Sequence, residues 1–448
     1  MRRTVLLALL GAMAVVAPRA AAQSTLTPAE GRRGDLAVFR EQFFSVDQSY
    51  SPGARAEAER QLAQLEQAAG ELTPARFELE LARIVALADN GHTNSPAARR
   101  SRRYARVPVR FVPFGTDFYV LRADSANADL LGARLLGIDR HPIADVRQAA
   151  HALWGGTPGY RDRQVPFLLE SPDQLLALGL AASGGKATYG FALRDGRRIE
   201  REIVADPANP TRERHGTVRW LYFGPLASDR GDWRMLGSPD LPWAFHEPDQ
   251  PFRWRHAPEL GAILVQLRAN RDSEGHSIAT FLGEVTEAIR KSPPQHAILD
   301  LRGNGGGDLN TTRDFVQGLP GLVPGRIFVL TSPWTFSAAI STTGYLKQAG
   351  GPRVTIVGEM VGDRLEFWAE GGWVQLPYSE AAMSIAVERH DYRTGCQPYK
   401  DCHAPLVRHP IRVPTLAPDI EAPLTIDAFM ANRDPGMDAV AAALKSGK

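Results

Sequence analysis

The sequence predicts an α/β protein whose C-terminal part is a parallel sheet flanked by helices. Two apolar runs, Ala297–Leu301 and Ile327–Leu330, are short, partly β-branched and bounded by glycine and proline. Buried strands of a parallel sheet have this composition. Amphipathic helical patterns alternate with such runs between residues 262 and 357. Alternating strands and helices of this kind build a parallel α/β layer.

Each further element of this layer has its own signal. The helix expected over His276–Lys291 carries Phe281, Val285 and Ile289 on one side. The other expected elements are strands at Ala262–Leu267 and Val354–Val357 and helices at Thr311–Gln317 and Ala338–Gln348.

Polar loops follow the two central strands directly. After the first come Gly303, Gly305, Gly306 and Gly307, whose bare backbone can turn N–H groups toward a ligand. After the second comes Ser337, just before a helix whose first amide can stabilise an oxyanion. A glycine cluster can also be a simple turn, and a serine at this place can be a helix cap. Together they predict a nucleophile facing an oxyanion hole.

The motif pair DLRGNGGG and VLTSPWTFSAA resembles the S41 peptidase family, the tail-specific and tricorn-core serine proteases. The resemblance implies a ClpP/crotonase-like catalytic core. It also implies that Ser337 is the nucleophile. The amides of Gly306 (or its neighbour Gly305) and Ala338 would then hold the oxyanion.

A histidine far upstream is the candidate general base. His92 lies in LADNGHT, which resembles the D-G-H-T segment of S41 relatives, where the histidine of the tricorn-like branch is the base. The alternative is a surface or capping histidine after a helix end. The order in sequence is no obstacle, because geometry alone defines a catalytic triad.

The lysine base of the other S41 branch is absent. The segment GEMVGDRLEFW carries Asp363 and Arg364 where that lysine would stand, and the nearest lysine is Lys347. An arginine is effectively always protonated and cannot act as a base. The acid that would orient His92 stays open between Asp363, Glu366 and Glu370.

The regions before the expected catalytic core differ in their predicted secondary structure. Helical patterns cover Gly34–Val46, Ala54–Leu72 and Phe77–Ala88, the last preceded by an N-cap and first-turn proline at Thr73 and Pro74. Short β-type runs follow, and the segment 131–149 resembles a PDZ domain, with a helix starting near Ile143. A hairpin is expected across Asp195-Gly196.

The expected division of the chain follows from these changes in predicted secondary structure. It comprises a signal peptide (1–22), an N-terminal helical domain (23–104), a PDZ-like domain with an insertion (105–205), a connecting segment that could cover the active site (206–258) and an S41-type catalytic domain (259–448).

The N-terminus has the pattern of a secretory signal peptide. Arg2 and Arg3 precede the apolar run Val5–Ala17, and small residues at 20–22 form a cleavage site. That run is short for a membrane span, which needs roughly 20 residues. The protein is therefore expected to be exported, periplasmic or secreted, without a membrane span. A net charge of +2 gives no electrostatic case for nucleic acid.

The two cysteines, Cys396 and Cys402, lie close together in TGCQPYKDCHAP. In an exported protein such a pair indicates a small-loop disulfide. The alternative is a metal site with His403 and His409, although the cysteine spacing does not match the usual zinc patterns.

The sequence thus predicts an exported serine endopeptidase that acts on peptides or proteins and needs no cofactor or metal. The loop GNGGGD lacks the third glycine of a dinucleotide loop, and no G-x-S-x-G elbow is present. One alternative is a non-catalytic ligand- or peptide-binding protein on the same scaffold. Another is an accessory protein that acts through the PDZ-like domain.

Overall fold

The computed structural model describes residues 26–210, 217–226, 232–273, 275–396 and 400–446. The predicted signal peptide, residues 1–22, lies outside them. Within the described ranges, no helix is both long and apolar enough to cross a membrane.

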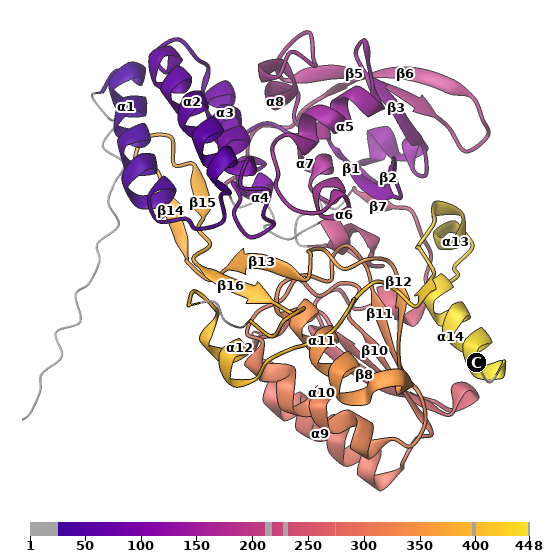
Figure 1. Cartoon of the computed structure of the whole chain (residues 1–448). Helices are drawn as coiled ribbons and strands as arrows, with labels where there is room; N and C mark the ends of the chain where they lie inside the picture. The colour runs from indigo at the N-terminus through magenta and orange to yellow at the C-terminus, as the bar shows by residue number, and fades with distance from the viewer. Residues whose placement is uncertain (1–25, 211–216, 227–231, 274, 397–399, 447–448) are drawn as a thin grey trace, which may run out of the picture.

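The N-terminal region is a helical layer, as the sequence predicts (Figure 1). Thr73 caps the third helix by accepting a hydrogen bond from the Arg76 amide, and Pro74 occupies its first turn. The expected first helix instead divides into an α-helix and a π-helical turn. The elements are α1 (Pro28–Val38), η1 (Phe39–Phe44), α2 (Pro52–Ala68), α3 (Pro74–Ala86) and α4 (Ala97–Arg100).

This helical layer shares a hydrophobic core with a distant hairpin. The hairpin is formed by β14 (Trp373–Gln375) and β15 (Ala382–Ser384), which pair antiparallel. Met383 and Leu376 pack with Phe39 and Phe77 in one buried cluster. Figure 1 shows α1 to α3 lying against this hairpin. The contact joins the N-terminal helices to a hairpin far along the chain, and the loop after α3 lies beside it through a bridge between Asn94 and Ser384.

The β-rich region forms a seven-stranded sheet with the order β1-β2-β3-β5-β6, to which β4 and β7 add at β3 and β2. The expected hairpin pairs Ala192 with Arg198 across its turn, and the expected helix starts at Ile143. The assignment of this sheet to the PDZ family stays a prediction. The strands are β1 (Val109–Phe114), β2 (Asp117–Ala123), β3 (Arg134–Ile138), β4 (His141–Pro142), β5 (Lys186–Ala192), β6 (Arg198–Val204) and β7 (Arg234–Met235).

Short helices fill the remainder of this region and of the connecting segment. They contribute buried residues to the hydrophobic core that the β-rich sheet shares with the C-terminal domain. They are η2 (Ser125–Leu130), α5 (Ile143–His151), α6 (Pro158–Asp162), α7 (Val165–Leu169), α8 (Pro172–Ala177), η3 (Thr217–Leu221) and η4 (Trp243–Phe245).

The C-terminal domain is built on a six-stranded sheet with the order β17-β12-β11-β10-β9-β8. Its strands run parallel except β8, which pairs antiparallel with β9 at the edge. The predicted parallel layer is confirmed. The strands are β8 (Phe252–Ala257), β9 (Ala262–Leu267), β10 (His296–Asp300), β11 (Ile327–Thr331), β12 (Val354–Gly358) and β17 (Ile420–Glu421).

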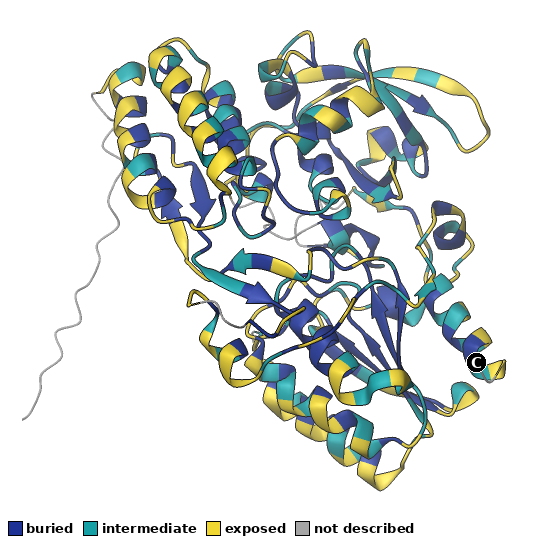
Figure 2. Ribbon diagram, viewed as in Figure 1, coloured by how far each residue is buried: buried dark blue, intermediate teal, exposed yellow. Residues whose placement is uncertain are grey.

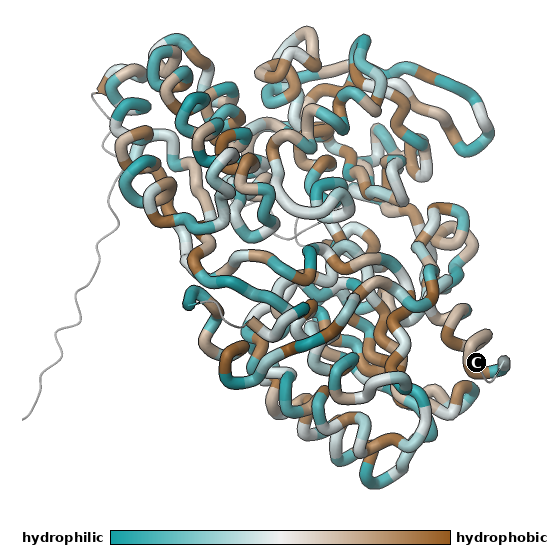
Figure 3. Tube along the Cα trace, viewed as in Figure 1, coloured by the Kyte–Doolittle hydropathy of each residue, from teal (hydrophilic) through white to brown (hydrophobic). Residues whose placement is uncertain are grey.

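Helices cover both faces of this sheet. The alternation of a strand places Ala297 and Leu299 in the core shared with α9 (Ile278–Lys291), α10 (Asn310–Leu322) and α11 (Ala338–Gly350). Ile298 points to the other face, which α14 (Pro435–Lys445) covers. The central strands are buried and hydrophobic, whereas the outer turns of α9 are exposed (Figures 2 and 3).

A two-stranded ribbon lies between the sheet and the helical layer (Figure 1). Its strands, β13 (Glu366–Ala369) and β16 (Glu388–Asp391), pair antiparallel. A disulfide joins Cys396 to Cys402 beside it, which confirms the predicted pairing and excludes these cysteines as metal ligands. The remaining short elements are η5 (Pro258–Leu260), η6 (Gly351–Arg353), α12 (Ala404–Arg408) and α13 (Ile426–Met430).

Candidate active site

Ser337 occupies a strained turn between β11 and α11. Its backbone has φ 55° and ψ −128°, a conformation that favours glycine. Holding a non-glycine residue there costs about 1–3 kcal/mol, and such strain concentrates at functional sites. Ser337 stands at the N-cap position, yet its hydroxyl makes no capping hydrogen bond. The simple helix-cap interpretation therefore fails.

Hydrogen bonds from the turn to the glycine loop fix this geometry. The Thr335 hydroxyl donates to the Leu301 carbonyl at 2.9 Å and accepts from the Ser332 amide at 3.0 Å. The Phe336 amide donates to the Asn304 carbonyl at 3.0 Å. The two loops that follow β10 and β11 thus form one unit, as expected for adjacent parallel strands.

Gly306 is the point of closest approach between the two loops. A Cβ added there would lie 2.5 Å from the Ser337 Cβ and 3.0 Å from the Ala338 nitrogen, and its φ of 97° also favours glycine. The Gly306 amide donates to the Asn304 side chain at 2.9 Å. Among the described residues, the amides of Gly305 and Ala338 have no hydrogen-bond acceptor. Two donors therefore remain beside the serine.

Asn270, which follows β9, forms hydrogen bonds with both loops. Its amide donates to the Gly306 carbonyl, and its side chain accepts from Asn304 at 2.8 Å. The same side chain donates to Thr312 on α10 and Thr342 on α11. All these side chains are buried, so the network replaces water with fixed partners. The sequence contained no motif for Asn270, because an asparagine after a strand resembles an ordinary turn residue.

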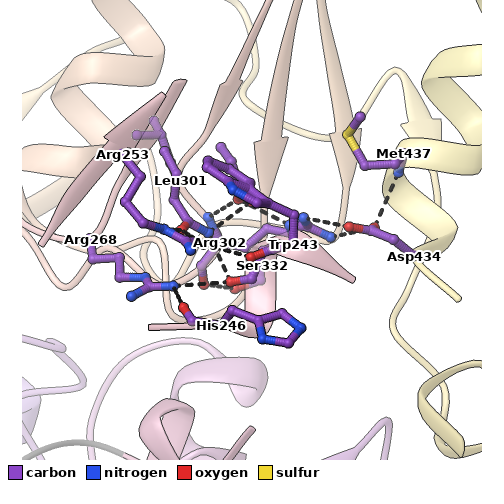
Figure 4. Close-up of polar contacts among 12 residues, drawn as sticks. Trp243, His246, Arg253, Arg268, Leu301, Arg302, Ser332, Asp434 and Met437 are labelled. Atoms are coloured by element: carbon purple, nitrogen blue, oxygen red, sulfur yellow. Dashed lines mark hydrogen bonds and ion pairs between the residues drawn. The ribbon is translucent and has the colours of Figure 1, made fainter. Parts of the chain in front are cut away.

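Arg302 anchors the start of the glycine loop. Its guanidinium pairs with Asp300 on β10 and with Asp434, which caps α14 by accepting from the Met437 amide (Figure 4). Its carbonyl accepts from the Ser332 hydroxyl at 2.6 Å. Burial opposes the charged form, but the two carboxylates hold the pKa of Arg302 well above its ordinary value. The DLRG motif therefore has a structural role behind the site.

His92 lies beside the nucleophile turn. Its ring stacks between Phe336, at 4.3 Å between centroids, and Phe367, at 5.0 Å. Phe336 directly precedes Ser337, so the structure brings the two predicted residues into one neighbourhood. Neither ring nitrogen of His92 has a hydrogen-bond partner among the described residues, and no bond to Ser337 is formed.

The loop after α3 is shaped to carry His92. The Asn90 side chain donates to the Trp368 carbonyl and accepts from its amide, which ties the loop to β13. A Cβ on Gly91 would lie 2.9 Å from Asp363 Oδ2 and 3.0 Å from the Phe336 ring. Only glycine fits there without moving these groups.

Of the three candidate acids, Asp363 is the one beside His92. Its Oδ2 lies 3.4 Å from His92 Nδ1, and its side chain is fully buried. Glu366 instead pairs with Arg389, and Glu370 lies 3.5 Å from His390. Arg364, which stands at the position of the lysine base, and Lys347, the nearest lysine, both form ion pairs with other residues. Arg364 pairs with Asp89, and Lys347 pairs with Asp419.

Two further histidines lie near Phe367, and one of them, His390, stacks on its ring. Glu370, His390 and His403 place ligand-type atoms within 4.8 Å of one another, although the sequence predicts no metal site. Burial lowers the pKa of His390 to about 4, so its ring is neutral near pH 7. The rings of His390 and His403 stack at 4.9 Å with only 13° between their planes. Their lone pairs lie in separate parallel planes, so a shared ion would require one ring to rotate.

Comparisons with known proteins bear on this arrangement. No known protein family and no curated protein matches the sequence. Among solved structures, mature CPAF complexed with lactacystin is similar, with a TM-score of 0.58 and 14% identity over 94% of this chain and 98% of that chain. A CPAF mutant gives 0.56 at 12% identity over 93% and 97%. CPAF is an S41-family peptidase. The chain has the fold of an S41 peptidase.

The S41 fold confirms the fold class predicted from the motif pair. Mature CPAF without that ligand gives a TM-score of 0.54 at 14% identity, again over 94% and 98% of the two chains. The similarity spans the helical layer, the β-rich sheet and the C-terminal domain together. The order of these parts along the chain is therefore that of the S41 fold.

Proposed function

We propose that this protein is a serine endopeptidase with Ser337 as nucleophile and His92 as general base. The observation that carries the proposal is the strained Ser337, with an unused hydroxyl, at the start of α11 and against Gly306. A strained, partly exposed serine before a helix N-terminus has no structural need of its hydroxyl. Such strain is retained where the side chain must be presented to a substrate.

In the proposed first step the Ser337 Oγ attacks the carbonyl carbon of a peptide bond, and His92 accepts the hydroxyl proton. Asp363 stands on the Nδ1 side of His92 and stabilises the imidazolium that forms. Catalytic hydrogen bonds often tighten only when the substrate is bound, so the unpartnered His92 nitrogens are compatible with this role.

The oxyanion formed in this step needs N–H donors. Ala338 supplies one at the N-terminus of α11, a helix of 13 residues whose dipole favours negative charge there. We assign the second to Gly305, because the Gly306 amide is taken up by the Asn304 side chain. Gly306 instead lets the loop approach Ser337. This assignment keeps the glycine loop as the oxyanion hole and chooses the alternative donor.

Collapse of the tetrahedral intermediate breaks the C–N bond, and the imidazolium returns its proton to the leaving amine. Water then attacks the acyl-enzyme with His92 again as base, which releases the acid product and restores Ser337. Each step is a proton transfer or acyl transfer between groups already in the site. The proposed chemistry therefore uses this chain's own residues throughout.

We also propose that the protein is exported. The signal-peptide pattern of residues 1–22 supports this, and the disulfide between Cys396 and Cys402 is of the kind formed in an oxidising compartment.

A fluorophosphonate probe, which phosphonylates activated serines, tests the proposal together with hydrolysis of a denatured protein substrate. The wild type should be labelled at Ser337 and should cleave the substrate, whereas Ser337→Ala should do neither. Ser292→Ala is the matched control, because Ser292 is exposed at the far end of α9. Hydrolysis that survives in Ser337→Ala would refute the proposal. A wild type that is neither labelled nor active would favour the binding-protein alternative.

A further inference from the structure

A large cleft opens next to the glycine loop. It encloses a cavity of about 850 Å³ and is lined by Gly303, Gly305 and the Trp334 ring of the nucleophile turn. Its other walls come from η3, from residues 248–251 and from the chain after β9. Five charged side chains line it: Arg163, Arg219, Arg268, Arg271 and Asp249. We call it the arginine cleft after the four arginines.

The charge of the arginine cleft is strongly one-sided. The single acid, Asp249, pairs with Arg219 at 2.7 Å, and its side chain is 83% exposed. Arg268 has no acidic partner among the described residues. It donates to the carbonyl oxygens of His246 and Gln250, as Figure 4 shows for His246. Backbone carbonyls satisfy its N–H groups, and the carboxylates of Glu247 and Asp300 interact with its charge, but without a direct ion pair.

The other two arginines differ in their surroundings, and the charge of Arg163 also acts on the buried carboxylate of Asp363. Arg163 donates to the Pro333 carbonyl at 3.1 Å, and its guanidinium lies 4.6 Å from the centre of the Phe336 ring. Arg271 is exposed and makes no hydrogen bond or ion pair with any residue in the described ranges. Arg163 thus brings positive charge next to the nucleophile turn, and Arg271 offers a free guanidinium in the cleft.

We propose that the arginine cleft binds an acidic side chain of the substrate, so that the enzyme prefers bonds with aspartate or glutamate nearby. The proposal rests on the proposed peptidase function. Guanidinium groups bind carboxylates through charge-assisted, often bidentate, hydrogen bonds. Because Gly305 lines the cleft and is the proposed oxyanion donor, a side chain close to the cleaved bond can enter it.

The test uses internally quenched peptides that differ at one position, from three residues before to three residues after a cleaved bond. Each position carries Glu, Gln or Lys, and every peptide is made with a free and with an amidated C-terminus. At one position at least, kcat/KM should be about tenfold or more higher for Glu than for Gln and lowest for Lys. The preference should weaken with added salt.

Arg271→Gln should lower kcat/KM for the Glu peptide more than for the Gln peptide and so remove most of this preference, and Arg271→Glu should favour the Lys peptide. The matched control is Arg290→Glu, since Arg290 is exposed on α9 and pairs with Glu287. Equal rates for Glu and Gln at all positions would overturn the proposal. So would a preference that Arg271→Glu leaves intact. A gain seen only with a free C-terminus would assign the cleft to the terminal carboxylate and overturn the side-chain assignment.

Binding to the Ser337→Ala protein separates this proposal from the peptidase proposal. Fluorescence anisotropy with labelled Glu and Gln peptides should show about tenfold tighter binding of the Glu peptide. Tighter binding of the Glu peptide by Ser337→Ala, together with a wild type that cleaves neither peptide, would support the cleft and refute the peptidase. Cleavage by the wild type together with equal binding of both peptides to Ser337→Ala would support the peptidase and refute the cleft.

Discussion

Asp363 Oδ2 lies 3.4 Å from His92 Nδ1, and neither atom has another hydrogen-bond partner among the described residues. The two residues come from distant parts of the chain, one after α3 and one after β12. An unpaired buried carboxylate oxygen is costly unless a charged or hydrogen-bonding group faces it. When His92 accepts the Ser337 proton at Nε2, its ring becomes an imidazolium, and the positive charge then faces this oxygen from the Nδ1 side.

Asp363→Asn should therefore reduce kcat by about 10²- to 10⁴-fold with KM nearly unchanged, because the amide cannot stabilise the imidazolium. The thermal midpoint should change little, since the Arg364 amide can still donate to the remaining oxygen. The measurement is steady-state kinetics with calorimetry on the same samples.

The two rejected acids provide the controls for this experiment. Glu366→Gln and Glu370→Gln should keep kcat within a few-fold of wild type, because Glu366 pairs with Arg389 and Glu370 faces His390. If either variant lost activity while Asp363→Asn kept it, the orienting residue would be wrongly assigned.

Gly306→Ala should reduce activity by about a hundredfold or more, equivalent to about 3 kcal/mol of transition-state stabilisation. The new Cβ would lie 2.5 Å from the Ser337 Cβ and would have to displace the serine turn or the loop. Gly305→Ala is the matched control. A Cβ there meets no atom within 4 Å, and the substitution keeps the Gly305 amide. Comparable losses in both variants would contradict the division of roles within the loop.

Much of this site could be predicted because its parts are local in sequence. Ser337 and Gly306 each follow a short apolar strand, and parallel strands place their carboxyl ends at one edge. The strand predicted over Ala297–Leu301 is observed at His296–Asp300, because the chain turns at Arg302 to reach Asp300 and Asp434. Such a boundary depends on a contact with a distant residue.

Other features depend wholly on tertiary packing and could not be predicted. Nothing in the spacing of Asp363, Glu366 and Glu370 tells which of them faces His92. The choice is made by the turn after β12, which packs on the Phe336 ring and on Gly91. The role of Asn270 likewise appears only once α10 and α11 surround it.

Glu359, at the end of β12, should make stability depend on pH. Burial raises its pKa from the ordinary value of 4.5 to about 7. The folded state therefore binds more protons than the unfolded state between these values, and the free energy of unfolding should fall as pH rises through that window. Glu359→Gln should remove this loss and stabilise the protein at pH 8 by at most about 3 kcal/mol.

Urea unfolding at pH 5 and pH 8 measures this effect. The difference between Glu359→Gln and wild type should be clearly larger at pH 8 than at pH 5. Glu259→Gln serves as the control, because Glu259 is exposed in η5 of the same domain. An equal difference at both pH values would mean that Glu359 does not titrate in this range.

Ser337 and His92 should act as one catalytic unit. Ser337→Ala and His92→Ala should each lower kcat by about 10⁴-fold or more, and the double variant should be hardly slower than either single one. The physical reason is that a hydroxyl without a base, and a base without a hydroxyl, both leave no activated nucleophile. His92→Ala also removes a ring that stacks on Phe336 and Phe367, so its thermal midpoint should fall. His92→Gln is the better probe, since it fills more of that space. Losses that add in the double variant would show that the two residues act independently, and the base would then have to be another residue.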